Sequence, residues 1–392
     1  MDTLENYAPL SSMSNTRTKA IEKSFLTAYE KYKVVPTRQE ISDLNSHFRR
    51  RRALYQTLGL VPNHLKGKRI LEFGPGSGEN SIYIASLRPR LYCLVDGTES
   101  SIDSLRAIRH IHYPELRVDL IYSDFLKFNS KKKYDAVFCE GAIPTQLYAK
   151  QMLLHIASFV QLGGILVITT MDAVSFLSEA IRRLLARLHI GQADLDLSHV
   201  PRLVEFFKTD LDSLKGMSRR REDWVIDQII HPWNGPLFSI ADAISTLETD
   251  FSAHGTSPRF FSDWRWYKSI CHEEDGFSAE LLTSYRTVLH NFLDWRFSLP
   301  AVDAHLNKNL LDLSQQIYDV QFAMERGLVP MNSESIVNLL HEILANCSQI
   351  HASTRFSIGK AIESLSSPLP PNECDLQGWW GRGQQYLSFI RR

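Results

Sequence analysis

The stretch Glu72-Phe73-Gly74-Pro75-Gly76-Ser77-Gly78 follows a run of apolar residues and precedes a helical pattern. Its three alternating glycines let the backbone turn sharply and let a ligand approach with no Cβ in the way. A dinucleotide loop has the spacing Gly-x-Gly-x-x-Gly, whose third glycine would fall at Glu79, where a carboxylate would repel a pyrophosphate. The acidic Glu72 suits a ligand that carries positive charge. The stretch therefore predicts a loop for a cationic ligand rather than for a dinucleotide.

Short apolar runs alternate with amphipathic helical patterns around this loop, which is typical of a parallel sheet covered on both faces. We predict five strands: Arg69–Phe73, Leu91–Asp96, Val118–Tyr122, Tyr134–Cys139 and Ile165–Thr170. Apolar residues at a spacing of three to four predict the crossover helices: Ser81–Leu87, Ser100–His110 and Leu147–Val160. These elements indicate an α/β protein with a doubly wound sheet.

Two later segments complete the predicted sheet. Phe251–Thr256 and Trp264–Ile270 are strand candidates, separated by turn residues, and would make the sheet seven-stranded and mostly parallel. A helix with Ser239 as its N-cap is expected before them. Within the second segment, Trp264, Trp266 and Tyr267 alternate as in a strand, which favours positions in the core. From about Gly276 onward the pattern predicts only helices.

The overall charge is balanced. The 392 residues include 44 basic and 44 acidic side chains, and 44% of the residues are hydrophobic. This composition indicates a globular protein with a large core and does not favour a nucleic acid partner. The arginine runs at 49–52 and 219–221 are interpreted as solvated faces.

Five scattered cysteines form no Cys-x-x-Cys pair and no Cys/His cluster, which favours a reducing compartment and no metal site. The first residues lack the apolar core of a signal peptide, and no stretch approaches the ~20 apolar residues of a membrane span. We therefore expect a cytoplasmic protein without a membrane span. The sequence leaves its oligomeric state open.

The segment 69–80 resembles the first motif of the class I S-adenosylmethionine-dependent methyltransferases, in which an acidic residue and three alternating glycines follow the first strand. Glu72, Gly74, Gly76 and Gly78 match the four fixed positions. The resemblance implies a Rossmann-like methyltransferase fold with S-adenosyl-L-methionine as cofactor. The acidic Glu72 would suit the cofactor's cationic ammonium and sulfonium groups.

The resemblance extends to the next strands. It implies that Asp96, at the end of the second strand, binds the ribose hydroxyls, since a carboxylate can accept both protons. It also implies that Asp124 lies near the adenine amino group, with Phe125 available to stack or pack against the ring. The aromatic-Asp pair Tyr134-Asp135 and the turn Gly163-Gly164 resemble the family's fourth and fifth strands.

Three residues are candidate catalytic groups. Glu140 and Asp172 follow the fourth and fifth strands at the carboxyl edge, where ligands of such folds bind. His231 lies in a turn-rich stretch of the expected cap, where an imidazole could accept a proton. Structural alternatives remain open, because Glu140 could cap the following helix and His231 could serve only its turn. The aromatic and glycine-rich segment 378–386 suggests a loop packed into an interface or cleft, without assigned chemistry.

These patterns divide the chain into five parts. We expect N-terminal helices over 1–65, a cofactor-binding Rossmann-like core over 66–171 and a helical cap insertion over 172–235. The end of the core sheet is expected over 236–275, and a helical region over 276–392.

We therefore expect an S-adenosylmethionine-dependent methyltransferase that acts by O- or N-methylation on a small polar, glycan or lipid-precursor acceptor. Balanced charge and a sizeable cap favour a small molecule over a polymer, which would need an open, charged groove. One alternative is an aminopropyltransferase-like enzyme, although that class carries a Gly-Gly-Asp-Gly type stretch where this chain has Glu140-Gly141-Ala142-Ile143. Another alternative is a non-catalytic protein that keeps the fold and acts through its helical C-terminal region.

Overall fold

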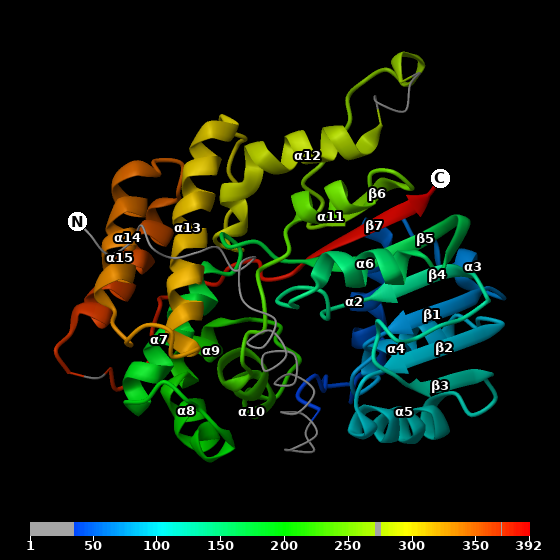
Figure 1. Ribbon diagram of the computed structural model, residues 1–392, viewed down its shortest axis with the longest axis horizontal. Helices are drawn as coiled ribbons and strands as arrows, with labels where there is room; N and C mark the ends of the chain where they lie inside the picture. The colour runs from blue at the N-terminus through cyan, green and yellow to red at the C-terminus, as the bar shows by residue number, and fades with distance from the viewer. Residues whose placement is uncertain (1–34, 271–275, 370) are drawn as a thin grey trace.

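The computed structural model describes residues 35–270, 276–369 and 371–392, and its centre is a seven-stranded sheet (Figure 1). The strands are β1 (Arg69–Phe73), β2 (Leu91–Asp96), β3 (Val118–Tyr122), β4 (Tyr134–Cys139), β5 (Val160–Thr170), β6 (Phe251–Ser257) and β7 (Gln385–Arg391). Their spatial order is β3-β2-β1-β4-β5-β7-β6. Strands β1 to β5 pair in parallel, and β7 is antiparallel to both of its neighbours. The predicted α/β class, a doubly wound and mostly parallel seven-stranded sheet, is confirmed.

One strand of this sheet comes from an unexpected part of the chain. The predicted strand over Trp264–Ile270 is wrong, because these residues contain only the short 3-10 helix η4 (Tyr267–Ser269). The last residues of the chain, β7, take the place between β5 and β6. Because β7 pairs with both β5 and β6, residues 264–270 have no strand to pair with between them. The prediction of helices alone after Gly276 is also wrong, because β7 belongs to this region and pairs along most of its length with β5.

The expected core positions of three aromatic residues are also wrong. Trp264 is 93% exposed, and Trp266 and Tyr267 are exposed as well, on an arm that projects from the body of the protein (Figure 1). Alternation of aromatic residues buries them only where a strand pairs into the sheet. Without that pairing, the three side chains stay in water.

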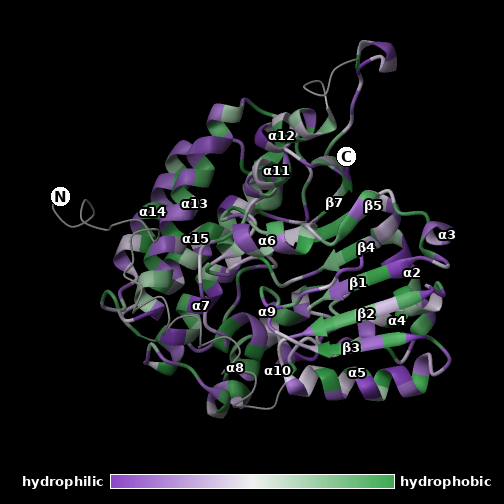
Figure 2. Cartoon of the chain, turned by 45° about the vertical axis from the view of Figure 1, so that its right-hand side comes forward, coloured by the Kyte–Doolittle hydropathy of each residue, from purple (hydrophilic) through white to green (hydrophobic). Residues whose placement is uncertain are grey.

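The two faces of the sheet are covered by different helices. One face packs against α2 (Leu44–Thr57), α4 (Glu79–Ser86) and α5 (Glu99–His112). The other face packs against α6 (Ala149–Ala157) and α11 (Ile240–Leu247). Successive residues of β1 point to opposite faces, so Ile70 belongs to the first core and Leu71 to the second. Figure 2 shows hydrophobic and hydrophilic residues mixed along α5, which packs one side on the sheet and leaves the other in water.

Local sequence signals start two of these helices. Thr98 caps α5 by accepting a hydrogen bond from the backbone N–H of Ser101. Ser239 and Asp242 form a capping box at the start of α11, so the predicted cap at Ser239 is confirmed. Of the predicted N-terminal helices, α2 and α3 (Pro62–Leu65) are seen, and residues 1–34 lie outside the described residues.

Helices from two separate parts of the chain lie beside the carboxyl ends of the parallel strands (Figure 1). The segment after β5 contributes α7 (Leu177–Ile190), η2 (Leu197–His199), α8 (Val200–Phe206), α9 (Lys208–Ser213), α10 (Arg221–Trp224) and the π-helix η3 (Val225–Ile230). The segment after β6 contributes α12 (Phe277–Val288), η6 (Leu289–Phe292), α13 (Ala304–Glu325), α14 (Glu334–Asn346) and α15 (Ala352–Ser366). Helix α13 packs on α7, so the two segments share one core.

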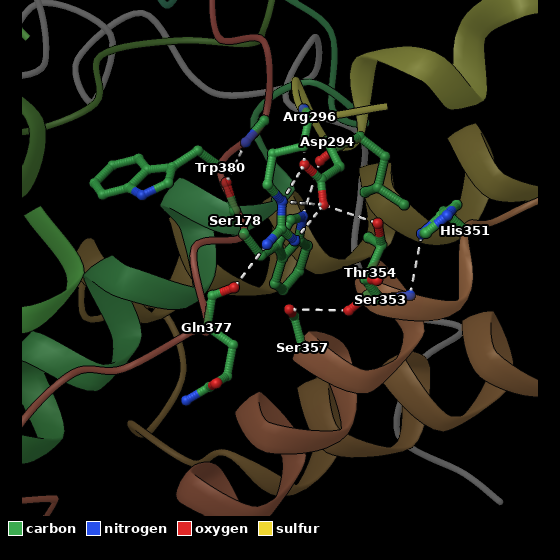
Figure 3. Close-up of polar contacts among 12 residues, drawn as sticks. Ser178, Asp294, Arg296, His351, Ser353, Thr354, Ser357, Gln377 and Trp380 are labelled. Carbon is green, nitrogen blue, oxygen red and sulfur yellow. Dashed lines mark hydrogen bonds and ion pairs between the residues drawn. The ribbon is translucent and has the colours of Figure 1, made fainter. Parts of the chain in front are cut away.

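The aromatic and glycine-rich segment before β7 is packed between these helices. Trp379 is fully buried and donates its indole N–H to the backbone oxygen of Leu293 at 2.8 Å. Figure 3 shows Arg296 between the carboxylate of Asp294 and the backbone oxygen of Gln377, which holds the start of the segment against the helical region. The segment therefore guides the chain from the helices back into the sheet.

Candidate active site

The glycine loop between β1 and α4 adopts a conformation that requires its glycines. Gly74, Gly76 and Gly78 all have positive φ angles, of 69°, 58° and 94°. A Cβ on Gly74 would lie 3.3 Å from the ring of Phe125, and one on Gly78 would lie 2.7 Å from Leu105. Side chains at these positions would strain the backbone and crowd the neighbouring segments.

Asp96 lies beside this loop at the end of β2. Its carboxylate accepts hydrogen bonds from the backbone N–H groups of Gly76 at 3.2 Å and Thr98 at 3.1 Å. Burial raises the pKa of Asp96, and these N–H donors oppose the shift. Two residues that the sequence assigned to the cofactor site, Asp96 and Gly76, are therefore in direct contact.

Asp124 and Phe125 follow β3 at the same edge of the sheet. The carboxylate of Asp124 accepts the backbone N–H of Leu126 at 2.8 Å. The ring of Phe125 packs edge-on against Phe73, with ring centroids 5.4 Å apart, and covers Gly74. Both Asp124 and Phe125 are half-buried. The ring of Phe125 therefore lies against the glycine loop.

Glu72 lies beneath the glycine loop, with its carboxylate bound to protein donors. Its side chain points to the face of the sheet covered by α2 and α4, where it accepts hydrogen bonds from Tyr92 and from Ser81, the latter at 3.1 Å. It is 5% exposed, and burial raises its pKa to about 7. Because both oxygens have donors within the protein, Glu72 supports the turn from β1 into α4.

Glu140, at the end of β4, is held by helix α2. The Nη2 atom of Arg51 lies 2.8 and 2.7 Å from its two carboxylate oxygens, and the hydroxyl of Tyr55 donates at 2.9 Å. The interpretation of the whole run 49–52 as a solvated face is wrong at Arg51, which is 6% exposed. The sequence held a signal for the burial of Arg51, because it lies four residues before Tyr55 and therefore on the same face of the helix.

Tyr386 of β7 interacts with the Arg51–Glu140 pair, and the sequence did not reveal this. Burial and the negative charge of Glu140 raise its pKa to about 12, while the positive charges of Arg51 and Arg219 oppose this shift. Tyr386 therefore lies within electrostatic reach of the Arg51–Glu140 pair and of the insertion after β5. No local pattern could have found it, since its position depends on the pairing of β7.

His231 lies at the end of the π-helix η3, in the insertion. Its Nδ1 atom is 3.9 Å from a carboxylate oxygen of Asp227, which also forms an ion pair with Arg219. Although burial alone would raise the pKa of Asp227, the charge of Arg219 and the hydrogen bond with His231 lower it. Short π-helices occur often at functional sites.

Asp172, just after β5, is 1% exposed. One of its oxygens accepts the backbone N–H of Ser175 at 2.8 Å, and the other accepts the hydroxyl of Tyr285 at 3.3 Å. Burial raises its pKa to about 6. These contacts anchor the first turn of the insertion to helix α12.

The strand order and the glycine loop define a class of protein, the class I methyltransferase-type α/β fold. Residues 64–207 match a family model described as "Methyltransferase domain". This part of the chain is a methyltransferase domain, in agreement with the predicted resemblance to the S-adenosylmethionine-dependent methyltransferases. The match agrees with the predicted methyltransferase class and with S-adenosyl-L-methionine as its cofactor.

Among solved structures, the chain is similar to the CcbJ methyltransferase from Streptomyces caelestis, at 20% identity and a TM-score of 0.28, over 32% of this chain and 50% of that chain. It is also similar to magnesium protoporphyrin IX methyltransferase from Synechocystis PCC 6803, at 14% identity and a TM-score of 0.35, over 61% of this chain and 91% of that chain. The match thus spans about half the length of CcbJ. No curated protein matches the chain significantly. Similarity at this level does not define an acceptor.

The residues around the loop fit the cofactor. Gly74 presents backbone without a side chain, and a Cβ there would enter the space between Phe125 and Ala142. Asp96 provides carboxylate oxygens at the end of β2, where a ribose would bind.

No helix in the described part of the chain is long and apolar enough to cross a membrane.

Proposed function

We propose that the protein transfers the methyl group of S-adenosylmethionine to a small polar, glycan or lipid-precursor acceptor by O- or N-methylation. The observation that carries this proposal is the cradle formed by the glycine loop, Asp96 and Phe125. In the proposal, the three loop glycines bind the cofactor with their backbone, Asp96 binds the ribose, and Asp124 and Phe125 bind the adenine. Glu72 contributes from beneath the loop, by supporting its shape.

The acceptor is proposed to bind outside the carboxyl ends of β1 and β4, where the strand order reverses. Glu140 lies at this point, and its ion pair with Arg51 fixes the carboxylate. We assign Glu140 the orientation of the acceptor through a hydrogen bond. Since Arg51 and Tyr55 already donate to it, it is less suited to accept a proton.

His231 is proposed as the general base. When bound, the cofactor supplies an activated methyl group on a sulfonium. His231 would take the proton of an acceptor hydroxyl or ammonium group, and Asp227 would stabilise the resulting imidazolium. The proposal is supported by Arg219, which pairs with Asp227 and also acts on Tyr386 beside Glu140. Asp172 supports this arrangement by fixing the start of the insertion that carries His231.

Calorimetry with S-adenosylmethionine and S-adenosylhomocysteine tests the cofactor site, and failure to bind either would exclude the proposed function. A labelled-methyl transfer assay on fractionated cell metabolites identifies the acceptor. Replacement of His231 by Asn should then lower kcat by roughly 10²- to 10⁴-fold without weakening cofactor binding. Incubation with decarboxylated S-adenosylmethionine tests the aminopropyl transfer alternative.

A further inference from the structure

Residues 37–40 run between the glycine loop and the insertion after β5, and we refer to them as the N-terminal strap. The strap precedes helix α2 and lies outside the part of the chain that matches the family model. It contacts the loop through Thr37 and the insertion through the residues that follow. The contacts on each side are specific and polar.

Thr37 makes the contact with the glycine loop. Its Oγ1 atom accepts the backbone N–H of Ser77 at 3.3 Å and lies 3.2 Å from the hydroxyl of Ser77. The hydroxyl of Ser77 donates its proton to Glu79 at 2.5 Å, so Thr37 must be the donor in the second contact. Thr37 also covers Gly76, where a Cβ would lie 2.4 Å from its Oγ1.

The next residues fasten the strap to the insertion. Arg38 forms a two-pronged ion pair with Asp223 of α10, at 2.7 and 3.1 Å. The side chain of Asp223 is only 1% exposed. Gln39 and Glu40 both bind Ser218, by side chain and backbone respectively. Opening the strap would therefore leave a buried carboxylate without its cation.

We propose that Thr37 is a positioning residue of the cofactor site and that Arg38 and Asp223 hold it in place. This inference rests on the proposed function. The hydroxyl of Thr37 fixes the Ser77 N–H beside Gly76, whose own N–H binds Asp96. The strap thereby keeps the loop in the shape that binds the cofactor and slows the cofactor's departure.

Surface plasmon resonance of the full chain with S-adenosylhomocysteine tests this inference. Thr37→Val removes the hydroxyl while keeping the shape, and it should raise the dissociation rate roughly fivefold. Thr37→Ser keeps the hydroxyl and should dissociate like the wild type. Arg38→Gln should accelerate dissociation. Arg265→Gln, which breaks a two-pronged Arg265–Asp263 pair on the projecting arm, should not.

An unchanged dissociation rate in Thr37→Val, with intact binding, would overturn the inference while leaving the proposed function standing. An unchanged rate in Arg38→Gln would overturn the part assigned to the ion pair. Absence of binding by the wild type would exclude the proposed function itself and the strap's role with it. Circular dichroism checks that each variant is folded. Because Thr37→Ser restores the hydroxyl alone, its agreement with the wild type separates positioning from a general loss of packing.

Discussion

The guanidinium of Arg51 holds both carboxylate oxygens of Glu140, although the two residues are 89 positions apart in the chain. Their side chains are 8% and 11% exposed. The pair joins helix α2 to the end of β4, next to the point where the strand order reverses. The N-terminal part of the chain therefore completes the edge of the sheet at which ligands of this fold bind.

Arg51→Met should destabilise the protein by about 3 kcal/mol, because it leaves the carboxylate of Glu140 without its cation in a largely buried place. The double variant Arg51→Met/Glu140→Leu should recover much of this loss. Urea denaturation measures both free energies of unfolding. Equal stabilities for the single variant and the wild type would show that the pair contributes nothing.

Asp96→Ala should weaken the binding of S-adenosylhomocysteine by roughly 10- to 100-fold, since hydrogen bonds to charged groups contribute about 1.5–3 kcal/mol each. The dissociation constant of Asp96→Asn, which retains one acceptor oxygen, should lie between those of the wild type and Asp96→Ala. Calorimetry provides the dissociation constants. If the alanine variant bound as tightly as the wild type, Asp96 would have no place in the cofactor site.

The contribution of Glu72 to the stability of the protein should fall as the pH rises from about 4.5 to 7. Burial raises the pKa of Glu72 from 4.5 to about 7, so the folded state keeps a proton that the unfolded state has released. Glu72 alone should cost about 3 kcal/mol across this window. Glu72→Gln should remove that part of the slope, while Asp172, with its pKa raised from 3.8 to about 6, should still contribute at lower pH. Urea denaturation between pH 4.5 and 8 measures the slope, and an unchanged slope in Glu72→Gln would contradict the assignment.

Gly381→Ala should destabilise the protein by about 3 kcal/mol or more. A Cβ there would lie 2.0 Å from the backbone oxygen of Ser175, so one of the two backbones must move. Gly383→Ala is a useful comparison, because a Cβ there meets no atom within 4 Å, although its positive φ of 58° adds some strain. Thermal unfolding compares the two. A smaller loss at Gly381 than at Gly383 would contradict this account of the C-terminal segment.

The first five strands could be predicted because each carries its signal locally. β2 is buried along its whole length, as its nearly continuous apolar sequence indicates. The glycine loop was equally readable, since only glycine suits its backbone. The seventh strand was not, because the alternating aromatic residues at 264–270 suggested a strand there, whereas the segment that pairs with β5 and β6 is β7 at the far end of the chain.

The resemblance carried by residue types at short spacing was enough to predict the methyltransferase family and its cofactor, and it named Gly74, Gly76, Gly78 and Asp96 as candidate site residues. The contacts that surround these four residues became visible only in the folded chain. Folding turned Glu72 beneath the loop, paired Arg51 with Glu140, and brought Tyr386 from the last strand to the same edge. Such contacts join residues far apart in the chain, and their energy depends on burial and charge that arise only when the distant segments pack together.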